Sequence, residues 1–145
     1  MKLSLIITLG LLVNLTMATP VTAANPVHVE QLQTTGECMG CDLSGADLRD
    51  AHLIGVDLRN ADLRKANLTG ANLEGADLTG ANLKGAILNS AFLTNASLND
   101  SNLDRVDLTA ATIIDADVTG ASMADLNLTH AQIFNTGIAI GGSDE

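Results

Sequence analysis

The sequence contains no Trp, no Tyr and only two Phe among its 145 residues. Its 7 Lys and Arg stand against 17 Asp and Glu, which gives a formal net charge of -10. Nucleic-acid binding depends largely on basic side chains that displace counterions from phosphates. We therefore expect no nucleic-acid partner. Hydrophobic residues, at 46%, are nevertheless too abundant for a disordered acidic chain, so one small folded domain is expected.

The N-terminus has the pattern of an export signal. Lys2 is followed by an apolar run from Leu3 to Val13, and the small residues at 21–23 (VTA) suit signal peptidase. We predict a signal peptide at 1–23, cleaved after Ala23. The alternative is an uncleaved membrane anchor, but the run is shorter than the ~20 residues that span a bilayer. We expect an exported protein without stable membrane insertion.

Residues 41–140 divide without a gap into twenty pentads. The central residue is Leu in 15 pentads and apolar in all of them, and the residue two positions earlier is Ala in 14. A period of five matches neither one face of an α-helix nor the alternation of a flat strand. Gly or Asn often ends the pentad, which indicates a turn there. Each pentad is therefore predicted to be a short extended segment followed by a corner.

The tandem pattern A-(D/N)-L-x-x, clearest over residues 66–78, resembles the pentapeptide-repeat family across essentially the whole mature chain. The resemblance implies an all-β fold, a right-handed quadrilateral parallel β-helix. Four pentads would form each coil, so residues 41–140 would form about five coils. The central side chains would point inward and stack on their counterparts 20 residues away. One predicted core column contains Leu43, Leu63, Leu83, Leu103 and Met123.

The N-terminal end of this coil has a predicted cover. Asn25 and Pro26 are typical of the N-cap and first residue of a helix, and Gly36 of its end. We predict a short helix through about Gln33 that covers the first coil, within an N-terminal cap at residues 24–40.

The C-terminal end has no such cover in the sequence, because the tail at 141–145, which we expect to be disordered, is short and polar. The apolar residues left at this end are Ile133, Phe134, Ile138 and Ile140. Dimeric members of the family suggest a homodimer through the C-terminal coil. Fraying of the last coil is the alternative.

Cys38 and Cys41 form a lone C-x-x-C at the end of the cap. A thioredoxin-like site would need a βαβ unit, and a zinc site would need a second ligand pair. In an exported protein a disulfide that closes the cap onto the first coil is the favoured interpretation. Free thiols and redox activity are the alternatives.

Outward residues can be assigned to faces by their position in the 20-residue coil. A set of apolar side chains then forms a candidate interaction strip, consisting of Ile54, Ile87, Phe92, Ile114 and Phe134. The alternative is that these are ordinary scattered surface residues. A file of carboxylates at Asp57, Asp77 and Asp117 is too widely spaced for one Ca²⁺, and no metal or cofactor is expected.

The repeat brings together no nucleophile, base and orienting group, so we expect no catalytic residues and no enzyme activity. The favoured function is an exported structural or protein-interaction module with an unknown protein partner. The resemblance to exported cyanobacterial members of the family places it in the periplasm or thylakoid lumen. The alternative that the resemblance offers is a DNA mimic that inhibits a topoisomerase, which the export signal disfavours.

Overall fold

The computed structural model describes residues 24–138. The predicted signal peptide at 1–23, the predicted tail at 141–145 and Ile140 lie outside the described residues. The described elements are α1 (Pro26–Thr35), β1 (Thr112–Ile114) and β2 (Gln132–Phe134).

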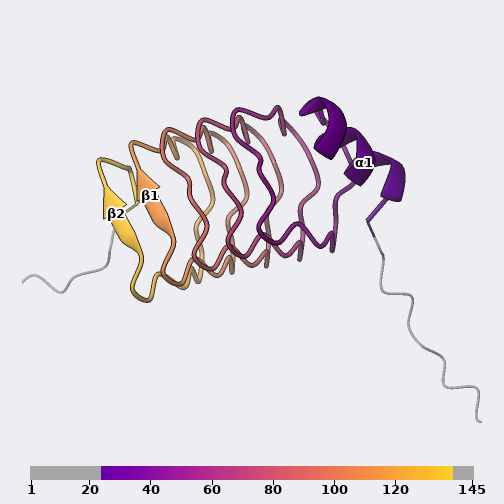
Figure 1. Cartoon of the computed structure of the whole chain (residues 1–145). Coiled ribbons are helices and arrows are strands. Elements are labelled where there is room, and N and C mark those ends of the chain that lie inside the picture. The colour runs from indigo at the N-terminus through magenta and orange to yellow at the C-terminus, as the bar shows by residue number, and fades with distance from the viewer. Residues whose placement is uncertain (1–23, 139–145) are drawn as a thin grey trace, which may run out of the picture.

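Helix α1 begins at the predicted Pro26 and continues to Thr35, two residues past the predicted end near Gln33. The Asn25 side chain accepts a hydrogen bond from the Val27 N–H at 3.0 Å, and Pro26 occupies the first turn. Gly36 ends the helix in the left-handed conformation, with φ 72°. Figure 1 shows α1 lying across the N-terminal end of the coil. Leu32 is only 2% exposed there, so α1 buries the apolar end of the core as predicted.

The rest of the described chain winds into a parallel β-helix. From Glu37 to Asp107, the residue before each pentad centre pairs with the residue 20 positions later, as in the series His52, Asn72, Phe92 and Thr112. Strands β1 and β2 continue this ladder as a parallel pair with Ile113 opposite Ile133. A register of 20 residues places four pentads in each coil.

The ladder begins one pentad earlier than the sequence pattern indicated. Glu37 already pairs with Asp57, and the Cys38 N–H donates to the Asp57 carbonyl at 2.8 Å. The left-handed Gly36 turns the chain from α1 directly into this first rung. Cys38 therefore occupies a central position of the repeat, and the predicted boundary between residues 40 and 41 falls too late.

The core consists of the stacked pentad centres and the alanines beside them. In the predicted column, Leu43, Leu63 and Leu83 are fully buried and Leu103 nearly so. Met123, in the last coil, is half-buried. Burial of each leucine removes its side chain from water, which stabilises the fold by roughly 1.5–3 kcal/mol per residue before entropy is counted.

Most pentads carry an Asp or Asn before the centre, and this residue has a local role that the sequence analysis did not assign. Its side-chain oxygen accepts a hydrogen bond from the N–H two positions later. Asn67 Oδ1 accepts from the Thr69 N–H at 3.1 Å, and Asn72 Oδ1 accepts from the Glu74 N–H at 3.0 Å. This contact holds the corner, and the last residue of the pentad then adopts positive φ. The repeat thus encodes its own turn.

Candidate interaction site

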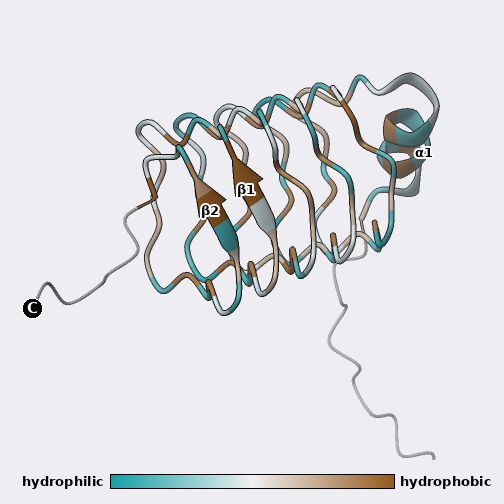
Figure 2. Cartoon of the chain, turned by 60° about the vertical axis from the view of Figure 1, so that its left-hand side comes forward, coloured by the Kyte–Doolittle hydropathy of each residue, from teal (hydrophilic) through white to brown (hydrophobic). Residues whose placement is uncertain are grey.

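One side of the β-helix departs from this turn pattern. We call it the strand face, defined by residues 51–55, 71–75, 91–95, 111–115 and 131–135. At the position before the centre, where the other sides mostly carry Asp or Asn, it carries His52, Asn72, Phe92, Thr112 and Gln132, of which Asn72 alone makes the turn contact. Within residues 24–138, β1 and β2 are the regular strands, and both lie on this face. Figure 2 shows them side by side, hydrophobic after their first residues.

The strand face brings three of the predicted strip residues together. Ile114 lies directly opposite Phe134 in the β1–β2 pair. Phe92 pairs with Thr112, so its side chain lies diagonally beside Ile114. Phe92 is 49% exposed and Phe134 69% exposed, and Ile114 is half-buried between them. We call Phe92, Ile114 and Phe134 the apolar patch.

The other two predicted strip residues do not join this patch. Ile54 is exposed, but Glu74 and Thr94 separate it from Ile114 in the same column. Ile87 lies one pentad before Phe92, on the adjacent side of the coil, and is 38% exposed. The predicted strip of five residues is therefore a patch of three with two outlying neighbours.

The charges around the patch are acidic. Among the described residues the strand face carries Glu74 and Asp115 and no Lys or Arg. The adjoining side, at residues 56–60, 76–80, 96–100 and 116–120, carries the predicted acidic file. Its one cation, Arg59, forms a bidentate pair with Asp57 at 2.6 and 2.9 Å. Hydrogen bonding by the Arg59 guanidinium lowers the pKa of Asp57 below its ordinary value.

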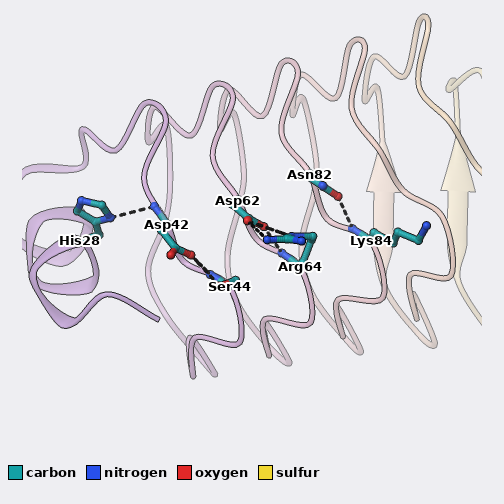
Figure 3. A network of polar contacts seen from close by, with 7 residues as sticks. All are labelled: His28, Asp42, Ser44, Asp62, Arg64, Asn82 and Lys84. Carbon is teal, nitrogen blue, oxygen red and sulfur yellow. Dashed lines mark hydrogen bonds and ion pairs between the residues drawn. The ribbon is translucent and has the colours of Figure 1, made fainter. Parts of the chain in front are cut away.

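Most cations lie on the opposite side of the coil. Figure 3 follows that side from α1 through Asp42, Arg64 and Lys84. Arg64 pairs with Asp62 at 2.5 Å, and this hydrogen bonding lowers the pKa of Asp62. These basic side chains are therefore placed away from the apolar patch.

The first rung obtains hydrogen bonds from α1 in place of a preceding coil. The Asp42 N–H donates to Nδ1 of His28 at 2.9 Å (Figure 3), and the Asn25 N–H donates to the Asp42 carbonyl at 3.3 Å. The Gln31 amide donates to the Glu37 carbonyl at 2.6 Å. Sequence reasoning placed the helix but missed these contacts, because a polar residue on a short helix carries no signal of its partner.

Cys38 and Cys41 form a disulfide, with their Cα atoms 5.2 Å apart. Both are buried, Cys38 at a Leu position and Cys41 at an Ala position of the repeat. The Cys38 Sγ lies 3.4 Å from the carbonyl oxygen of His28 in α1. The bond therefore joins two successive pentads at one corner beneath α1, whereas the sequence suggested a link from cap to coil.

The C-terminal end is more open than the N-terminal end. Its core residues Met123, Leu126, Leu128 and Ile133 are half-buried. Ile138 is an exception to the prediction, because it is only 8% exposed. Gly137 passes close to Val118 of the preceding coil. A Cβ at residue 137 would lie 3.1 Å from a Val118 methyl, so a larger residue would push the segment outward. This close approach explains why Ile138 packs into the core.

The described residues offer neither a metal site nor a membrane span. Across residues 24–138, no three His, Cys, Asp or Glu side chains gather in a way that would hold a metal ion. The same range contains no helix that is long and apolar enough to cross a bilayer.

Comparisons with known proteins agree with the architecture. The model of a family described as pentapeptide repeats (8 copies) matches residues 41–80, 76–113 and 101–136. The chain is similar to the solved pentapeptide repeat protein alr5209 from Nostoc PCC 7120, with 31% identity, a TM-score of 0.56 and coverage of 77% of this chain and 96% of that chain. It is also similar to the pentapeptide repeat protein Rfr23 from the cyanobacterium Cyanothece 51142, with 25% identity and a TM-score of 0.50. The match covers 77% of this chain and 92% of that chain. No curated protein matches the sequence.

A third similar structure is AT2G44920, a pentapeptide repeat protein from the Arabidopsis thaliana thylakoid lumen. It is 31% identical, with a TM-score of 0.43 and coverage of 76% of this chain and 74% of that chain.

Proposed function

Because the chain belongs to the pentapeptide-repeat family, we propose that it is a non-enzymatic interaction module, built as a right-handed quadrilateral coil of about five turns. The observation that carries this proposal is the apolar patch. It gathers three apolar side chains on the strand face, where Asn72 alone among the described residues makes the side-chain turn contact. Clustered exposed apolar side chains mark interaction sites.

We also propose that the protein works outside the cytoplasm, in the periplasm or thylakoid lumen. The signal-peptide pattern of residues 1–23 supports this location. The Cys38–Cys41 disulfide supports it as well, because disulfides persist in oxidising compartments.

The arrangement of the outward polar side chains supports a non-enzymatic role. Many of them are engaged in the corners, where Asp and Asn accept backbone N–H groups and neighbouring hydroxyls donate to the same oxygens. Such groups shape the backbone and are not directed toward a common point. A catalytic site needs several groups that converge on one reacting atom.

The C-terminal end is proposed to pair with a second copy of the chain. Among residues 24–138, core residues at this end are half-buried and no further described coil lies over them, and an open coil edge invites association. Analytical ultracentrifugation of the exported protein over a wide concentration range tests the pairing. A sedimentation coefficient that stays that of a monomer at the highest concentration refutes the homodimer.

The interaction function is tested by isolating the tagged exported protein from its native host under mild crosslinking. We expect a discrete complex that contains a defined partner and elutes well before the chain or its dimer. An exported protein of similar size and charge, carrying the same tag, is the control. The proposal is refuted if the chain elutes without a partner that the control lacks.

A further inference from the structure

The structure points to the kind of partner segment that this module binds. We infer that the strand face docks an amphipathic α-helix of a partner protein, with apolar residues on Phe92, Ile114 and Phe134 and basic residues toward Glu74 and Asp115. The inference rests on the proposed interaction function and names the chemistry of its partner.

The size of the apolar patch favours a single helix. An aromatic side chain buries roughly 150–250 Å², so three partly exposed side chains offer well under the ~800 Å² per partner of a stable globular interface. A helix in a groove, by contrast, binds through a few anchors at positions such as i, i+4 and i+7. The patch has the number of anchor sites that one short helix needs.

The spacing of the rungs also suits a helix. Phe92, Ile114 and Phe134 lie on three successive rungs. Rungs at the ~4.8 Å strand spacing place the first and last about 10 Å apart along the coil. Helix residues i and i+7 are also about 10 Å apart, since each residue rises about 1.5 Å. A helix parallel to the coil axis therefore places one anchor on each rung. Phe92 lies in the column beside that of Ile114 and Phe134, and this sideways offset fits within the apolar stripe of an amphipathic helix.

The charges around the patch specify basic flanks on the partner helix. Glu74 lies in the same column as Ile114, and Asp115 follows Ile114 at the corner. Beyond that corner lies the acidic side with Asp77 and Asp117. Lys or Arg beside the apolar stripe would meet these carboxylates, and complementary charge favours encounter and orientation.

The same charges disfavour two other occupants. A second copy placed patch to patch would bring the acidic surroundings of two patches together, and like charges across an interface are unfavourable. An anionic lipid surface would meet the same carboxylates on a chain of net charge -10. A helix with basic side chains meets the same carboxylates with opposite charge, so neither repulsion arises.

The test uses a synthetic helix of about 18 residues made of Leu and Lys, with one Trp on its apolar face. The protein has no Trp or Tyr, so the emission of the peptide Trp reports binding without background. Two peptides serve as controls: one of the same composition with the apolar residues dispersed, and one with Glu in place of Lys. With the exported protein we expect a blue shift only for the amphipathic basic peptide, and weaker binding as salt rises.

Variants assign the binding to the patch. The first variant combines Phe92→Thr and Ile114→Thr. Thr already occurs in both columns, at Thr112 beside Phe92 and at Thr94 beside Ile114, so the coil should stay folded. We expect at least a tenfold loss of peptide affinity. The matched control Ile54→Thr, on the same face but outside the patch, should change the affinity less than twofold.

A second pair of changes leaves the apolar side chains intact. Glu74→Gln with Asp115→Asn should weaken binding at least threefold and reduce its dependence on salt. This pair keeps the inference testable if the double threonine variant unfolds, which its thermal melting curve will show.

The inference is overturned by any of several results. These are equal binding of the dispersed peptide, unchanged affinity in both double variants, or equal loss in the Ile54→Thr control. If the unchanged protein self-associates and the threonine variant does not, the patch binds a second copy instead. If the unchanged protein binds anionic vesicles and the threonine variant does not, the patch binds a membrane instead. If the native complex forms equally with the threonine variant, the docking inference fails while the proposed interaction function stands.

Discussion

Replacing Leu83 with alanine tests how tightly the core of the coil is packed. Leu83 is 0% exposed and lies in the column between Leu63 and Leu103. Its N–H donates to the Asn102 carbonyl at 2.9 Å, and the Leu63 N–H donates to the Asn82 carbonyl at 2.8 Å. Backbone ladders on both sides therefore hold the neighbouring coils in place.

The expected cost follows from this geometry. Replacing a buried Leu with Ala destabilises proteins by about 2–5 kcal/mol, and the cost is largest where the surroundings cannot collapse into the cavity. Since the coil spacing is fixed by hydrogen bonds above and below Leu83, we expect about 3–5 kcal/mol. Met123→Ala is the matched change in the last coil of the same column. Met123 is half-buried with a described coil on one side only, so about 1 kcal/mol is expected.

Urea unfolding followed by far-ultraviolet circular dichroism measures both changes, because the protein lacks the tryptophan that fluorescence would need. Equal slopes of the transitions would show that the native and unfolded states remain comparable. A loss below 1 kcal/mol for Leu83→Ala, or equal losses for the two variants, would refute the packed column with an open C-terminal end.

Three further predictions follow from the corners and the first rung. Ala110 has φ 57°, so Ala110→Gly should relieve left-handed strain and stabilise the fold by about 0.5–1 kcal/mol, and an unchanged or lower melting temperature contradicts this. Hydrogen bonding by Arg59 lowers the pKa of Asp57, so the stability from this pair is present above pH ~4 and is lost as the pH falls through the lowered pKa. Arg59→Gln should therefore reduce the dependence of the unfolding free energy on pH in that range. Reduction of the disulfide should destabilise the protein by about 2 kcal/mol, since the closed loop is short. Cys38→Leu with Cys41→Ala, which places the usual repeat residues, should make stability independent of reductant, and a native protein that is equally insensitive would contradict the stabilising role of the disulfide.

The predictions that succeeded from sequence depended on local chemistry or on the repeat. Asn25, Pro26 and Gly36 defined α1 because capping involves neighbours in the chain. The register of 20 residues followed from the family resemblance, and it correctly placed Phe92 near Ile114 although they lie a full coil apart.

The predictions that failed concerned the two ends of the coil. Cys38 was assigned to the cap because the pattern A-(D/N)-L is not visible in Gly36, Glu37 and Cys38. Ile138 was expected to be exposed, but the close approach of Gly137 to the preceding coil buries it. At an end, burial depends on which other segment lies over a residue, and periodicity does not contain that information.

The sequence by itself determined the pentad, its turn and its buried centre, because a five-residue unit with Leu, Ala and a short polar side chain satisfies its own local hydrogen bonds. Only the tertiary structure decided how the coil starts beneath α1, where the disulfide lies, and that Phe92, Ile114 and Phe134 form one patch apart from Ile54. Those outcomes depend on contacts between segments distant along the chain. Such contacts form only when the backbone ladders bring successive coils into register.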